Sequence, residues 1–123
     1  MLANIPASRR KLIERVAAAA RRSQLRIGTV DPARFVREYY HGVAEGDLAQ
    51  HAVTELAALA LAHQQFARTR APGATIVRVF NPDSRRDGFS SPHTVVQVTT
   101  DDMPFLVDSI RLVFDRHGLP IHF

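Results

Sequence analysis

The chain has 123 residues, of which 46% are hydrophobic, a size and composition typical of one globular domain. It contains no cysteine, which excludes disulfide bonds and thiolate metal sites. The net charge is +4, and no apolar run approaches the length of a membrane span. We therefore expect a cytoplasmic domain with no membrane partner.

Residues 7–22 predict a first helix, because four alanines in a row favour helix and Ser8 can serve as its N-cap. Its narrow apolar stripe comprises Leu12, Ile13, Val16 and Ala20. Arginines and one lysine cover the rest of the surface. Such a face either binds nucleic acid or an anionic membrane surface, or is a solvated helix face that docks on another part of a larger protein. No aromatic residue lies between the charges to stack a base, so we favour docking and expect no nucleic-acid partner.

Asp31-Pro32 is a helix start signal, with Asp as N-cap and Pro in the first turn, and predicts a second helix over 31–44. Its Tyr39 and Tyr40 could stack a ring, but tyrosines at such positions more often pack and hydrogen-bond between helices. We therefore predict that both lie at a helix–helix contact.

Gly46 ends this helix, and Asp47 is predicted to cap a third helix over 47–70. Its apolar residues recur at steps of three and four and predict one seam: Leu48, Ala52, Leu56, Leu59, His63 and Phe66. The histidines of this helix, His51 and His63, are twelve residues apart, whereas two metal ligands on one helix are typically four apart. Both are predicted to be core or partner-facing histidines rather than ligands.

After the break at Ala71-Pro72-Gly73, alternating residues predict a strand at 75–80. Thr75, Val77 and Val79 lie on one side, and Ile76, Arg78 and Phe80 lie on the other. A polar loop at 81–92 follows. It has one glycine and no phosphate-binding pattern, and whether it is functional or mobile stays open.

The last quarter of the chain predicts strand, turn, helix, glycine stop and strand. β-Branched residues fill 94–100, and Asp101-Asp102-Met103-Pro104 is predicted to open a helix with the aspartates as caps. The stripe of that helix comprises Leu106, Ile110, Val113 and Phe114. Gly118 ends the helix, and Ile121 and Phe123 are predicted to begin a second strand.

The stretch TTDDMPFLVDSIRLVFDRHGLPIHF resembles the N-terminal region of the large bacterial NAD-dependent glutamate dehydrogenases. ARTRAPGATIVRVFNP and DPARFVREYYHGVAEGDL extend the resemblance over most of the chain. The same unit is similar to the first half of an ACT domain, in which D-x-P-G-L precedes a helix and a G-L-N-I strand. The resemblance implies an α+β fold, with a helical segment at 1–72 and a partial ACT-like, ferredoxin-like β-α-β unit at 73–123.

The resemblance implies a noncatalytic segment, regulatory or for assembly, of an enzyme that converts L-glutamate to 2-oxoglutarate and ammonia. The segment has no dinucleotide fingerprint or acid–base pair, so NAD would bind elsewhere in the parent enzyme. Its expected partners are the remaining domains of the same polypeptide and further copies in a homo-oligomer. One alternative is a free-standing ACT-like module that binds an amino acid; another is a basic nucleic-acid-binding protein.

The candidate ligand or interface site is the turn of Asp101, Asp102, Met103 and Phe105. Free N–H groups at a helix start attract anions, and ACT domains dock small ligands there. Phe105 stands where the ACT pattern has glycine, so we expect it to exclude an amino acid. Its side chain is predicted to enter the core beside Leu106 and Ile110. The sheet is expected to keep an unpaired edge that recruits partners by strand addition.

Overall fold

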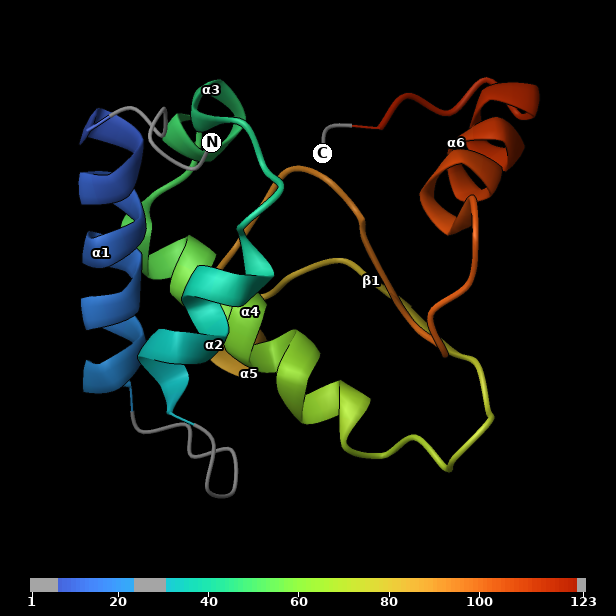
Figure 1. Cartoon of the computed structure of the whole chain (residues 1–123). Helices are drawn as coiled ribbons and strands as arrows, with labels where there is room; N and C mark the ends of the chain where they lie inside the picture. Colours follow the sequence, from blue (N-terminus) through green and yellow to red (C-terminus); the bar gives the residue numbers. More distant parts are fainter. Residues whose placement is uncertain (1–6, 24–30, 122–123) are drawn as a thin grey trace.

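The computed structural model describes residues 7–23 and 31–121 and confirms the α+β class. These described residues form six helices and two strands, in the order α1 (Ala7–Arg22), α2 (Pro32–Tyr39), α3 (Glu45–Ala49), α4 (Val53–Ala67), β1 (Ile76–Phe80), α5 (Ser84–Asp87), β2 (Val95–Thr99) and α6 (Leu106–Arg116). In Figure 1, α1 and α2 lie on one side of α4, and α6 lies apart from them. None of these helices is both long and apolar enough to cross a membrane.

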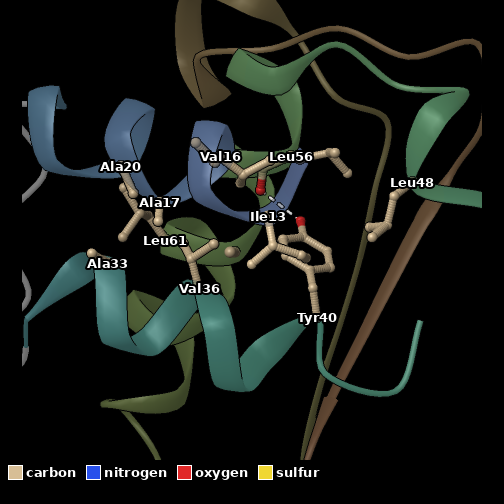
Figure 2. Packing of buried hydrophobic residues seen from close by; sticks show 12 residues of the cluster. Ile13, Val16, Ala17, Ala20, Ala33, Val36, Tyr40, Leu48, Leu56 and Leu61 are labelled. Atoms are coloured by element: carbon tan, nitrogen blue, oxygen red, sulfur yellow. Dashed lines mark hydrogen bonds between the residues drawn. The ribbon is translucent and has the colours of Figure 1, made fainter. Parts of the chain in front are cut away.

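The hydrophobic core belongs to the first four helices (Figure 2). Val16 and Ala20 of α1 meet Val36 of α2 and Leu61 of α4, and all four side chains are fully buried. Alanines at the contacts let the helix axes approach closely, and larger residues fill the remaining space. The predicted stripe of the first helix is therefore correct, although α1 begins at Ala7, which places Ser8 inside its first turn rather than at its N-cap.

Tyr39 of α2 and Tyr40, its C-cap residue, both lie between helices, as predicted. The Tyr40 hydroxyl donates a hydrogen bond to the Leu56 carbonyl over 2.6 Å, and burial raises the Tyr40 pKa above its ordinary value. The rings of Tyr39 and Tyr40 meet edge to face with centroids 4.9 Å apart. Asp31 caps α2 as expected, because its side chain accepts from the Ala33 N–H.

The prediction of one long third helix over 47–70 is wrong. The chain forms α3 and α4 with a turn over 50–52, and Asp47 lies within α3 rather than capping it. The turn lets Leu48 enter the core, and the His51 ring contacts the Glu55 carboxylate at 2.9 Å. The predicted single seam is also incomplete, because α4 is apolar on two sides. Leu56, Ala57, Ala60 and Leu61 are buried, and Leu59, His63 and Phe66 are half-buried.

β1 and β2 pair antiparallel, with Val77 opposite Val98 and Val79 opposite Val96. The predicted alternation in β1 is confirmed: Val77 and Val79 are exposed, and Ile76, Arg78 and Phe80 are half-buried. On the covered face, Gln97 is only 2% exposed, and its amide finds no partner among the described residues. Such burial costs about 1–3 kcal/mol. His122 and Phe123 of the predicted last strand lie outside the described residues, and Ile121 is not in a strand.

Arg9 is the one arginine of α1 whose guanidinium reaches into the body of the protein. It donates to the carbonyl oxygens of Tyr40, His41 and Val43 over 2.7–3.2 Å. Carbonyls at a helix C-terminus lack intrahelical partners, and a guanidinium fork satisfies several of them at once. Arg9 therefore closes the end of α2 and is not part of the predicted solvated face.

We expect Arg9→Lys to lower the free energy of unfolding by about 1–2 kcal/mol, because a single ammonium cannot reproduce the fork. Arg10→Lys is the matched control: Arg10 is exposed, and its change should stay below about 0.5 kcal/mol. Urea denaturation of both variants measures the difference. Equal losses in the two would contradict this role for Arg9.

Candidate functional site

The turn that the sequence singles out follows β2 directly, and its first residues are held by neighbouring elements. The Asp101 carboxylate accepts from Arg70 Nη1 over 2.9 Å, and Arg70 also donates to the Ala74 carbonyl. The hydroxyls of Thr75 and Thr100 lie 2.7 Å apart and share a hydrogen bond. These contacts tie the end of β2 to the connection between α4 and β1.

The aspartates do not cap α6, which corrects the sequence prediction. The helix begins at Leu106, its N-cap position is Phe105, and no side chain caps it. Phe105 explains the shift, because its left-handed backbone conformation cannot belong to a right-handed helix, which therefore begins one residue later. Asp102 and Met103 are both exposed. The four residues of the predicted site thus form an open turn in which only Asp101 has an ion-pair partner.

Phe105 also differs from expectation, since its side chain is 76% exposed rather than packed in the core. Its φ of +61° is the only positive value at a described non-glycine residue. This left-handed conformation favours glycine, because a Cβ crowds the following carbonyl oxygen. The backbone conformation at this position thus explains why the ACT pattern has a glycine there, whether or not that glycine also admits a ligand.

A shallow groove of about 260 Å³ lies behind the turn, where α2, α4, β2 and the start of α6 meet. It is lined by Phe35, Tyr39, His63, Gln64, Ala67, Val98, Thr99, Thr100 and Leu106. None of these residues carries a full charge at neutral pH. The groove therefore offers aromatic and aliphatic contacts with a few polar atoms, and no cation for a carboxylate ligand.

Three polar side chains join the helices to the sheet at this groove. The Tyr39 hydroxyl lies 2.7 Å from His63 Nδ1, and His63 Nε2 lies 3.2 Å from the Thr99 hydroxyl. Burial raises the pKa of Tyr39 to about 12 and lowers the pKa of His63 below its ordinary value. Both rings are therefore neutral near pH 7 and serve as hydrogen-bonding groups.

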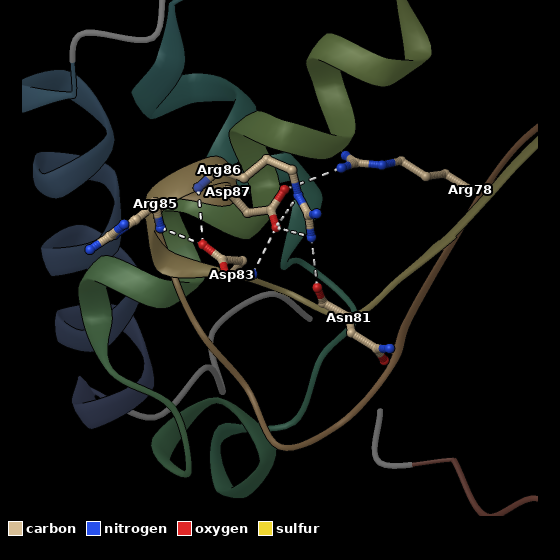
Figure 3. Close-up of polar contacts among 6 residues, drawn as sticks. All are labelled: Arg78, Asn81, Asp83, Arg85, Arg86 and Asp87. Carbon is tan, nitrogen blue, oxygen red and sulfur yellow. Dashed lines mark hydrogen bonds and ion pairs between the residues drawn. The ribbon is translucent and has the colours of Figure 1, made fainter.

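The predicted loop at 81–92 contains α5 and is held by a cluster of aspartates and arginines (Figure 3). Asp83 caps α5 by accepting from the N–H groups of Arg85 and Arg86. The Asp87 carboxylate is buried and accepts from the Asp83 N–H and from the guanidinium groups of Arg86 and Arg78. These hydrogen bonds lower the Asp87 pKa, and the one from the Asp83 N–H has the largest effect. The loop is thus a structural support for the sheet.

Within residues 7–23 and 31–121, no three histidine, aspartate or glutamate side chains gather closely enough to hold a metal ion. His63 is packed, as the sequence predicts. Sequence reasoning did not identify the contacts of His63 with Tyr39 and Thr99, or the pairing of Arg70 with Asp101. Their partners lie 24 to 36 residues away, so no local pattern connects them.

The comparisons with known proteins agree on one family. Residues 35–123 match the protein family described as glutamate dehydrogenase, ACT1 domain. Two curated proteins named NAD-specific glutamate dehydrogenase, from Halomonas elongata and Pseudomonas aeruginosa, are 39% and 33% identical to this chain over 88 residues. These alignments cover 72% of the chain but only 6% and 5% of the two relatives. No solved structure matches.

We expect Phe105→Ala to change the free energy of unfolding by less than about 1 kcal/mol, because the side chain is exposed. Phe105→Gly should lie in the same range, since relief of the positive φ offsets the added freedom of the unfolded chain. Phe89→Ala is the matched control: Phe89 is buried and should cost about 3–5 kcal/mol. A loss of that size at Phe105 in thermal melts would place its ring in the core.

The lowered pKa of His63 predicts a pH-dependent stability. Above about pH 6.5, the ordinary histidine pKa, His63 is neutral in both the folded and the unfolded chain. As the pH is lowered below this value, the unfolded chain takes up the proton first. The free energy of unfolding therefore decreases as the pH decreases, until the pH passes the lower pKa of His63 in the folded chain. His63→Gln should flatten this slope between about pH 5 and 7. Exposed His41→Gln is the control, and denaturant titrations at each pH measure both variants. An unchanged slope in His63→Gln would contradict the assignment.

Proposed function

Because the chain belongs to the family of glutamate dehydrogenase ACT1 domains, we propose that it is an N-terminal, noncatalytic segment of an NAD-dependent glutamate dehydrogenase. The parent enzyme would be an oxidoreductase that converts L-glutamate to 2-oxoglutarate and ammonia. The observation that carries the proposal is the match of 88 residues to two proteins named for this activity. The chain spans about one twentieth of their length, which leaves room elsewhere for NAD and the catalytic residues.

The role of the segment in the parent would be assembly or regulation, with the remaining domains of the polypeptide and further copies as partners. The proposal includes a cytoplasmic location. Support comes from the uneven burial of apolar side chains. The helices before residue 72 bury theirs in a shared core, whereas no apolar side chain of β1, β2 or α6 is fully buried and about half of them are exposed. We propose a division of the chain at 72–73 on this basis, with docking surfaces concentrated in the second part.

Amino-acid binding by a free-standing module is less well supported. A free amino acid presents a carboxylate and an ammonium group, and each needs a charged or hydrogen-bonding partner when it is desolvated. The groove behind the turn is lined only by uncharged residues, and the start of α6 lies beside an exposed Phe105. These surroundings suit contact with protein side chains better than a zwitterion.

We expect the purified 123-residue chain to reduce no NAD in the presence of L-glutamate and to show no saturable heat with a panel of amino acids. NADH absorbance and titration calorimetry measure the two halves, with a full-length glutamate dehydrogenase as the positive control. Turnover that follows the chain through successive purification steps would refute the noncatalytic role. Saturable binding of one amino acid would favour the alternative module.

A further inference from the structure

The β1–β2 hairpin, residues 76–99, meets α4 but buries little apolar surface. Both strands are fully described, and none of their apolar residues is buried. The strand side chain that is buried is Gln97, and neither the nitrogen nor the oxygen of its amide has a hydrogen-bond partner among the described residues. A buried amide without partners disfavours the conformation that buries it. The position of the hairpin in this structure, here called closed, therefore carries a cost on the covered face of the sheet.

One end of the hairpin is anchored on the helices by the α5 segment. Gly88 lies against α4, since a Cβ at Gly88 would be 3.9 Å from the Ala58 Cβ, and the neighbouring Phe89 is buried. Asp87 accepts a hydrogen bond from Arg78 and so joins the same segment to β1 (Figure 3). The α5 end of the hairpin is thus held by buried contacts.

At the opposite end of the hairpin, the attachment to the helices is small and polar. The Thr99 hydroxyl lies 3.2 Å from His63 Nε2 of α4, and the Tyr39 hydroxyl of α2 lies 2.7 Å from the other ring nitrogen. A second contact, between Arg70 and Asp101, is an ion pair whose carboxylate is 63% exposed, and such pairs contribute little to stability. The hydrogen bond between His63 and Thr99 is therefore the main polar attachment of this end.

We propose that the hairpin is a lid, which pivots about its α5 end and is held closed by the hydrogen bond between His63 and Thr99 as its latch. The groove behind the turn lies between the two layers, with Phe35 of α2 on one wall and Val98 of β2 on the other. Lifting the lid widens this groove and brings water to the Gln97 amide, which removes the cost of burying it. Open and closed positions thus differ by few interactions, as in other elements that open locally.

Distances between nitroxide labels on engineered cysteines measure the position of the lid, because the native sequence has no cysteine. Ala18→Cys on α1 and Val77→Cys on β1 form the reporting pair, and both sites are exposed. Ala18→Cys with exposed Thr54→Cys on α4 is the control pair, since it spans the helical core alone. In pulsed electron paramagnetic resonance, we expect a minor second distance in the reporting pair and a single distance in the control pair.

Thr99→Val tests the latch, because it keeps the shape of the side chain and leaves a ring nitrogen of His63 without its partner in the closed position. The ratio of the second distance to the first should rise at least roughly fivefold, the change expected for loss of one hydrogen bond. Thr100→Val is the matched control. Its hydroxyl bonds Thr75 rather than α4, so the ratio should not change.

Gln97→Leu tests the cost of the closed position, because it replaces the buried amide with a hydrocarbon of similar size. Introduced together with Thr99→Val, it should lower the ratio at least roughly fivefold. A single distance in Thr99→Val, an equal rise in Thr100→Val, or a rise that Gln97→Leu does not reverse would overturn the proposal. A control pair that broadens together with the reporting pair would also overturn it, because the whole fold would then be loosening. The glutamate dehydrogenase assignment rests on turnover and ligand binding, and none of these outcomes alters it.

Discussion

The position of α4 between two unlike layers is the constraint on which the rest of the structure depends. On one side, Leu56, Ala60 and Leu61 pack against α1 and α2 in an alanine-rich contact. On the other side, His63 reaches Thr99 of the sheet. A sheet of two strands is marginally stable alone, so its position depends on the helix that supports it. Loss of packing along α4 would therefore affect the helical core and the sheet together.

The helices and the sheet differ in how far their apolar residues are buried. The helical part has a closed core, an arginine that closes the end of α2, and tyrosines with buried hydrogen bonds. The part after residue 72 contributes little to that core, and hydrogen bonds and ion pairs hold much of it in place. The family match extends through this second part, and most of the exposed apolar surface lies there. That distribution is the basis on which docking surfaces were proposed for the second part of the chain.

Features with a local cause could be predicted from the sequence. Asp31 caps α2, and Gly118, at a φ of +66°, ends α6 with hydrogen bonds from Gly118 N–H to Asp115 and from Leu119 N–H to Phe114. Features that depend on distant partners could not. Arg9 looked like a solvated charge because the carbonyls that it binds lie more than 30 residues away. The turn at 50–52 contains no glycine or proline, so nothing in the local pattern marks it.

The place of α1 has a consequence for how the unit is defined. The likeness to the family begins at Phe35, which lies inside α2. A boundary drawn there would discard the Asp31 cap, the whole of α1 and the buried Val16 and Ala20. Leu61 of α4 would then face water where it now faces another helix. The stretch of sequence similarity is therefore shorter than the stretch that builds the hydrophobic core, because the core also requires α1.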